Sequence, residues 1–310
     1  MEAVIHIVFP VFGLVLIGYL FGRVEILNNN NASALNDYVY YIGLPVLLFY
    51  QTAKTPIYEL LYYSFMLFGL CSNLAISFID FGTRKLLFSH TIERASAFSF
   101  SAAFSNVGFM GIPLFIAAFG ETGTLPAVLM AIISNIVILG TVVIFLEIGD
   151  KSIASIYDIF KHVISSLLKN PMVIGSILGI LVAALNLQLP LALNNLLAMI
   201  SQSASPVALF AIGLSMIGLG IHIKLNELIS MVIFKLILFP LLTFFIVTYI
   251  FVLERHWAMS AVLLSALPTG AIVFVICQKY NTYVKESSSV FLVTTLVSTV
   301  TLSLLLYIYL

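Results

Sequence analysis

Apolar residues fill long stretches of this chain, and polar residues gather in short segments between them. Apolar runs of about 20 residues recur from one end to the other, each long enough to cross a hydrocarbon layer roughly 30 Å thick. We count ten such runs and predict that each is a membrane-spanning helix. The predicted spans lie near residues 4–22, 34–52, 60–80, 97–118, 125–147, 171–187, 203–221, 230–252, 258–277 and 288–309.

The longest connection, residues 150–170, joins the fifth and sixth predicted spans. Its apolar residues recur at helical spacing, and its polar residues occupy another face of the same helix. This pattern is typical of a short amphipathic helix on the membrane surface, and equally of a connector helix packed on protein. The apolar positions are Ile153, Ile156, Phe160, Val163 and Leu167.

Helix-breaking residues interrupt the fourth and ninth apolar runs near their middle. The fourth run reads Ser105-Asn106-Val107-Gly108-Phe109-Met110-Gly111-Ile112-Pro113, and the ninth reads Ser265-Ala266-Leu267-Pro268-Thr269-Gly270. A broken helix leaves backbone N–H and C=O groups unpaired, which hydrocarbon tolerates only inside protein or beside a cavity. Two such breaks at corresponding places in two halves of a chain indicate the binding site of a transporter.

Short matches between the two halves indicate a duplicated unit. The string Pro45-Val46-Leu47-Leu48-Phe49 in the second run recurs as Pro206-Val207-Ala208-Leu209-Phe210 in the seventh, and Ser101-Ala102 recurs as Ser260-Ala261. Five spans are an odd number, so the second copy points the opposite way across the membrane. We therefore predict an all-α polytopic protein of two inverted five-helix repeats, in which the broken fourth and ninth helices cross. The predicted repeats are 1–147 and 170–310, joined by a cytoplasmic connector with an amphipathic helix at 148–169.

Composition agrees with an integral membrane protein that has no separate soluble domain. Hydrophobic residues make up 62% of the chain and charged residues 8%, against about 25% charged in an ordinary soluble domain. The formal net charge is zero, so bulk charge implies no nucleic-acid partner. Both cysteines, Cys71 and Cys277, lie in apolar runs and indicate buried thiols with no disulfide framework.

Lysine and arginine predict the orientation in the membrane. Eleven of them follow odd-numbered spans, and only Lys54 and Arg255 lie on the other side. The positive-inside rule then places both termini outside the cytoplasm in a multi-pass protein of the cell membrane. The eleven are Arg23, Arg84, Lys85, Arg94, Lys151, Lys161, Lys169, Lys224, Lys235 (assigned to a helix start), Lys279 and Lys285.

Several kinds of chemistry lack their residues in this sequence. No H-E-x-x-H pattern, Ser–His pair, paired mid-membrane Asp residues or phosphate-binding G-x-x-x-x-G-K-[ST] run occurs, so we expect neither an enzyme nor a metal site nor direct drive by ATP. No Asp or Glu falls clearly mid-membrane, which weakens a proton relay. Na⁺ held by carbonyls and hydroxyls at the breaks, H⁺ carried with the substrate, and uncoupled transport stay open. No cofactor is expected.

The interrupted segments resemble those of the auxin efflux carrier family, in particular its bacterial members. The run from Asn106 to Pro113 is similar to the family's fourth-helix signature, and Ala266-Leu267-Pro268 followed by Phe274-Val275 is similar to its ninth-helix pattern. The resemblance covers nearly the whole chain. It implies a scaffold and a transport domain, with substrate bound beside the crossing of helices four and nine. It also implies small organic anions such as malate or malonate, and leaves an auxin-like acid as an alternative.

The residues at the breaks suit a carboxylate. N-terminal ends of half-helices carry free N–H groups and partial positive charge, and an asparagine binds a carboxylate or hydroxyl while it stays neutral. For the glycines, helix packing is an equal alternative, and for Asn135 an interhelical hydrogen bond is. The predicted substrate-binding residues are Asn106, Gly108, Gly111, Pro113, Ser265, Pro268, Thr269, Gly270 and, in the fifth span, Asn135.

The sequence therefore predicts a secondary transporter that moves a small organic anion by alternating access. The alternative is a membrane sensor that keeps the carrier fold and binds its ligand without transport. The expected partners are the organic anion and the lipid bilayer. A homodimer formed through scaffold helices is a further expectation, with no residue pattern behind it.

Overall fold

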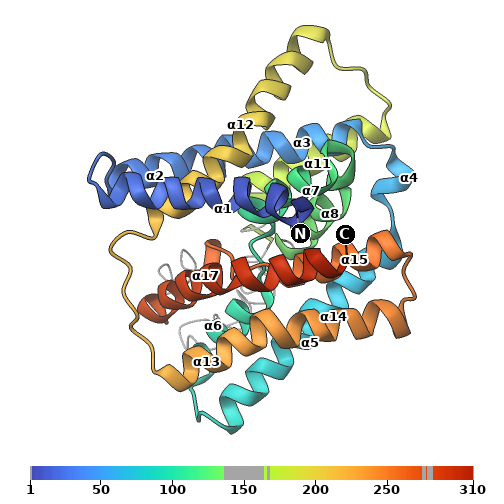
Figure 1. Ribbon diagram of the computed structural model, residues 1–310. Helices are drawn as coiled ribbons and strands as arrows, with labels where there is room; N and C mark the ends of the chain where they lie inside the picture. The colour runs from blue at the N-terminus through green and yellow to red at the C-terminus, as the bar shows by residue number, and fades with distance from the viewer. Residues whose placement is uncertain (1, 136–163, 166–167, 274–276, 278–281, 310) are drawn as a thin grey trace. The chain divides into compact units, whose positions relative to one another are not determined.

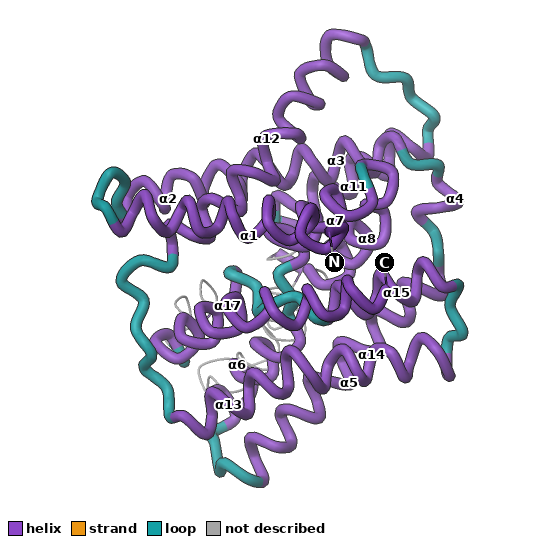
Figure 2. The backbone as a smooth tube through the Cα atoms, in the orientation of Figure 1, coloured by secondary structure: helices purple, strands orange, loops and turns teal. Residues whose placement is uncertain are grey.

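The computed structural model describes residues 2–135, 164–165, 168–273, 277 and 282–309. Every regular element in this part of the chain is a helix, and one isolated β-bridge is the only extended pairing there (Figure 2). Five of the described helices are long and apolar enough to cross a membrane, and two shorter apolar helices accompany them. The all-α, multi-pass class is thus confirmed, and the count of ten spans stays a prediction. The five are His6–Arg23, Ile57–Leu86, Leu191–Ser215, Leu225–Ile250 and Val284–Tyr309, and the shorter two are Val107–Phe119 and Pro171–Ala184.

The chain forms two compact units whose segments alternate along the sequence. Unit 1 comprises Met1–Tyr63, Val107–Ile132 and Leu168–Gly218, and unit 2 comprises Ser64–Asn106, Ile133–Leu167 and Leu219–Leu310. Unit 1 holds α1 (Glu2–Arg23), α2 (Asn29–Tyr38), α3 (Leu44–Lys54), α4 (Ile57–Leu60), α7 (Ile112–Phe119), most of α8 (Leu125–Ile133), α11 (Pro171–Ala184) and α12 (Leu191–Ser215). Unit 2 holds α5 (Tyr63–Leu86), α6 (Ile92–Ala103), α13 (Leu225–Ile233), α14 (Phe239–Phe245), α15 (Arg255–Ser265) and α17 (Val284–Tyr309) (Figure 1).

Small residues bring the helices of unit 1 into close contact. Where α1 meets α12, a Cβ on Gly18 would lie 2.1 Å from the carbonyl oxygen of Phe210, and a Cβ on Gly213 would lie 1.8 Å from that of Val15. The α11–α3 contact uses Gly175 in the same way. Van der Waals packing of backbones is the main attraction between helices in lipid, because burial from water contributes nothing there. These glycines therefore determine which helices of unit 1 pack together.

Prolines within the helical runs follow turns of π-helix. The π turns Val39–Gly43, Val107–Gly111 and Phe234–Leu238 each lie just before a proline, namely Pro45, Pro113 and Pro240 in that order. Proline lacks an N–H, and its ring clashes with the carbonyl four residues earlier. A wider i→i+5 turn relieves that clash and lets the helix continue.

Unit 2 contains charged groups that are buried and paired. Asp80 and Arg84, one turn apart on α5, are fully buried and 2.9 Å apart. Glu227 of α13 accepts a hydrogen bond from Arg94 of α6 at 3.0 Å and lies 3.2 Å from Nε2 of His90. These pairs neutralise charge that would otherwise be costly to bury, and the second cluster ties α6 to α13.

Two predicted elements need comment. The seventh span, predicted at 203–221, instead occupies Leu191–Ser215, because the helix begins directly after Pro190 and carries its polar residues, such as Asn194 and Gln202, within it. The predicted surface helix at 148–169 lies almost entirely outside the described residues.

Candidate functional site

Both predicted interruptions occur in unit 2. Helix α6 ends at Ala103, and Phe104–Asn106 are not helical; α15 ends at Ser265, and the chain is not helical again until residue 272. Pro268 lies inside the second interruption, as predicted. The prediction that Pro113 breaks the fourth span is wrong, because the π turn Val107–Gly111 carries the helix through it into α7. The real break lies earlier, at Phe104–Asn106.

The two interruptions pair with each other through their backbones. The N–H of Asn106 donates to the carbonyl of Pro268 at 2.9 Å, and the N–H of Gly270 donates to the carbonyl of Phe104 at 2.9 Å. Ser105 and Thr269 face each other between these bonds as an antiparallel bridge. Each break thus supplies the partners that the other break needs, which removes the cost of unpaired backbone groups away from water.

Side chains cap the C-terminal ends of the two helices at this junction. The hydroxyl of Thr269 donates to the carbonyl of Ser101, in the last turn of α6, at 2.8 Å. The ammonium of Lys235 donates to the carbonyl of Ser265, the last residue of α15, at 3.3 Å. The last four carbonyls of a helix have no partner within the helix and carry partial negative charge, so a hydroxyl and an ammonium complement them.

Lys235 was assigned to a helix start by sequence, and this assignment is wrong. The apolar helical run begins at Leu225, so Lys235 lies ten residues inside it, and its side chain is fully buried. Its Nζ lies 2.6 Å from the hydroxyl oxygen of Ser105 and 4.6 Å from the ring centre of Phe239. Without Lys235, the bias of basic residues becomes ten against two. The missed signal was a lone lysine among apolar residues, five before Pro240.

Asn106 has an unused hydrogen-bond donor. The residue is 2% exposed, and its side-chain Nδ2 has no hydrogen-bond partner. Ser105 and Asn106 are consecutive in an extended segment, so their side chains project to opposite sides. Lys235 therefore lies on the Ser105 side of the junction, and the free amide of Asn106 lies on the other. A buried donor without a partner costs about 1–3 kcal/mol, which an incoming acceptor would recover.

The other predicted site residues fall into three groups. Pro268, Thr269, Gly270 and Ser265 lie at the junction, where the hydroxyls of Thr269 and Ser265 already donate to backbone carbonyls. A Cβ on Gly270 would lie 2.6 Å from the ring of Phe104, so this glycine is needed for packing. Gly108, Gly111 and Pro113 follow Asn106 along the chain but belong to unit 1, where Gly108 faces Leu44. Asn135 is buried at the end of a described segment, and no contact places it at the junction.

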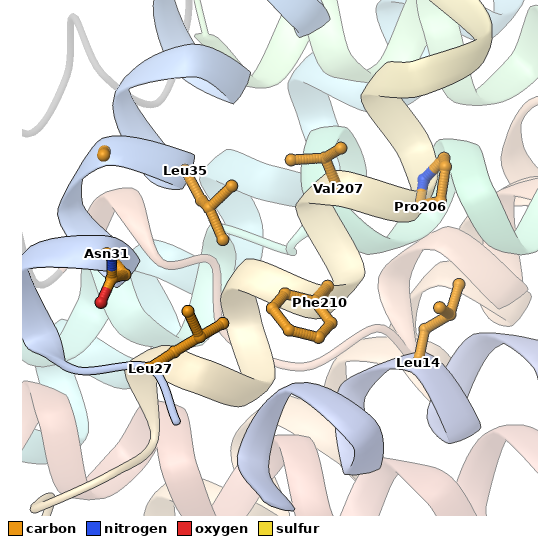
Figure 3. Close-up of a pocket in the computed structure, with 8 residues that line it drawn as sticks. Leu14, Leu27, Asn31, Leu35, Pro206, Val207 and Phe210 are labelled. Carbon is orange, nitrogen blue, oxygen red and sulfur yellow. The ribbon is translucent and has the colours of Figure 1, made fainter. Parts of the chain in front are cut away.

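A separate pocket of about 460 Å³ lies in unit 1 between α1, α2 and α12 (Figure 3). Phe210 and Val207 of α12 project toward Leu35 of α2, and Leu14 of α1 closes another side (Figure 3). Asn31 is its one amide side chain, and the remaining lining is apolar. The pocket includes no residue of the junction and has no donor set for an anion.

Comparison with known proteins agrees with this picture. Residues 3–306 match the family model described as "Membrane transport protein". A protein of Rhizobium meliloti (strain 1021) named "Putative malonate transporter" is 29% identical over 307 residues, which cover 99% of this chain and 96% of that protein. "Uncharacterized transporter YfdV" of Escherichia coli (strain K12) is 26% identical over 96% of this chain and 95% of its own length. "Uncharacterized transporter MJ1031" of Methanocaldococcus jannaschii is 27% identical over 68% of each chain.

A family model that matches nearly the whole length, on a chain of apolar helices, confirms the resemblance drawn from the fourth and ninth runs. It also identifies the protein as a membrane transporter and not an enzyme. The chain belongs to the membrane transport protein family, the auxin efflux carriers.

Proposed function

We propose that this protein is a secondary carrier for small organic anions and that the carboxylate binds at the paired breaks of unit 2. The observation that carries the proposal is the free side-chain amide of Asn106, buried at a junction that also holds the ammonium of Lys235. Within the described residues Lys235 has no ion pair with an acidic side chain. The junction therefore has positive charge and a donor in excess, which favours an anion over a cation.

Helix geometry adds a second source of positive potential. The apolar helix Val107–Phe119 begins directly after Asn106, so its N-terminal N–H groups start at the break. The free N–H groups of a helix N-terminus favour a negatively charged group. Asn106 and this helix start together offer a carboxylate several neutral donors, with no arginine required.

The substrate class follows from the junction and from the relatives. A malonate-sized acid is small enough to be held by a few convergent donors, and the R. meliloti relative carries malonate in its name. Mono- and dicarboxylates of two to four carbons are therefore the substrates to test first. Transport requires that the site open alternately to the two sides of the membrane, as in carriers built from inverted repeats. Basic residues, ten against two, support extracytoplasmic termini in the cell membrane.

Flux into liposomes tests the proposal. The purified protein is reconstituted, and uptake of a panel of labelled mono- and dicarboxylates is measured with and without Na⁺ and pH gradients. We expect saturable uptake of at least one small carboxylate, inhibited by its unlabelled form. Binding without flux would favour a sensor, and the absence of both would refute the anion carrier.

A further inference from the structure

We propose that the ammonium of Lys235 is a built-in cation that replaces a coupling Na⁺, so that this carrier works without sodium. This inference rests on the proposed function and adds the question of coupling to it. Its basis is the set of atoms around Nζ, all of which belong to unit 2.

The ligands of Nζ are those that a bound Na⁺ would use. Nζ lies 2.6 Å from the Ser105 hydroxyl oxygen and 3.3 Å from the Ser265 carbonyl oxygen, and the face of Phe239 lies 4.6 Å away. Carbonyl and hydroxyl oxygens are the ligands by which broken helices of transporters coordinate Na⁺. Here a tethered ammonium has both oxygens, and its three N–H donors have three acceptors if the ring face is included.

The position of Lys235 also serves the two roles of a coupling cation. It bonds to the last carbonyl of α15, so it neutralises the negative end of that helix. Through Ser105 it also holds the strand that bears Asn106. It lies on the opposite side of this strand from the Asn106 amide, so it supports the anion site from behind and does not occupy it.

Burial explains why a lysine can do this. Its side chain is 0% exposed, on a helix of mean hydropathy 2.4. Charged side chains within membrane helices are rare, because they are costly there, and they commonly have a functional role. A lysine that only filled space would be replaced by methionine or leucine at no cost in function. We therefore assign Lys235 as a positioning residue for the anion site.

The first test uses the wild-type protein. Uptake of the carboxylate found by the flux panel is compared in Na⁺ medium and in medium where N-methyl-D-glucamine replaces Na⁺. We expect rates that agree within about twofold, because no Na⁺ site is open. A rate that rises about tenfold with Na⁺ would overturn the inference while it left the anion carrier intact.

The second test uses three variants. Lys235→Met keeps the volume and removes the charge, Lys235→Ala also opens space for an external cation, and Lys224→Met changes an exposed lysine at the start of α13 as the control. We expect flux to fall about tenfold or more in both Lys235 variants, because the α15 carbonyl loses a charged donor. Methylammonium or Na⁺ should restore part of the flux in Lys235→Ala only. Wild-type flux in Lys235→Met would overturn the inference.

A third measurement needs no known substrate. The thermal unfolding midpoint of the detergent-solubilised wild type is measured in NaCl and in KCl. We expect equal midpoints, because a ligand stabilises only a protein that binds it. A midpoint raised specifically by Na⁺ would reveal a sodium site and contradict the inference, even if none of the carboxylates tested is transported.

Discussion

At the scale of single residues, the junction separates side chains that complete the structure from one that awaits a partner. Thr269 and Lys235 cap helix ends, and their donors are in use. Asn106 is equally buried, yet its Nδ2 has no acceptor. Loss of a donor that bonds destabilises the fold, whereas loss of a donor that does not bond costs little. Stability and transport should therefore respond differently to substitution at these positions.

Asn106→Ala should abolish carboxylate transport and leave folding nearly unchanged. Removal of an unpaired buried amide should change the free energy of unfolding by less than about 1 kcal/mol. Thermal unfolding in detergent and flux in liposomes measure the two effects separately. Asn195→Ala, on the exposed first half of α12, is the control and should keep both properties. Wild-type flux in Asn106→Ala would remove this residue from the mechanism.

His90 should make stability depend on pH. Burial lowers the pKa of its imidazole below the usual value, although the Glu227 carboxylate beside it acts in the opposite direction. An unfolded chain then takes up a proton more readily than the folded protein. Stability should be full above the unfolded pKa, about 6.5, and should fall as pH drops below it. Unfolding midpoints between pH 8 and pH 5 (about three units across that pKa) should fall less steeply in His90→Gln; an unchanged slope would contradict this reading.

At the scale of helices, two glycines of α1 make opposite predictions. A Cβ on Gly18 would lie 2.1 Å from the Phe210 carbonyl of α12, whereas a Cβ on Gly13 would have no atom within 4 Å. Gly18→Ala should therefore force α1 and α12 apart and lower the unfolding midpoint. Gly13→Ala should be neutral or stabilising, because alanine exceeds glycine in helix propensity by about 1 kcal/mol. Equal midpoints for the two variants would show that close packing at Gly18 does not hold unit 1 together.

The sequence predicted the helices better than the details of their interruptions. Apolar runs and helix breakers marked the fourth and ninth spans, because hydrophobic length and Pro/Gly content are local properties. The break at Phe104–Asn106 was placed too late, at Pro113, because a π turn can absorb a proline and nothing local reveals that it does. Lys235 was assigned to a helix end because its partners, Ser105 and Ser265, are remote in sequence. Such partners appear only once the chain has folded.

At the scale of the whole molecule, segments far apart in sequence must meet for the site to exist. Ser105 and Thr269 form the non-hydrogen-bonded pair of the bridge, a pair whose Cα atoms lie about 4.5 Å apart in antiparallel strands. Ser105→Cys/Thr269→Cys, in a background without Cys71 and Cys277, should therefore form a disulfide on mild oxidation. A protease site inserted between α11 and α12 allows the cross-link to be read on a gel. Fragments that stay joined are expected; fragments that separate, as in the single-cysteine controls, would refute the pairing.

The central claim is that a carboxylate binds to the side-chain amide of Asn106 where the two interruptions pair. Solid-state NMR in proteoliposomes tests it most directly, through dipolar coupling between the ¹³C-carboxylate of the transported acid and ¹⁵N side-chain amides of asparagine. The account predicts a coupling that corresponds to hydrogen-bond contact, with Nδ2 about 3 Å from a carboxylate oxygen, and its loss in Asn106→Ala. A bound acid without that coupling, or one whose coupling survives in Asn106→Ala, would contradict it.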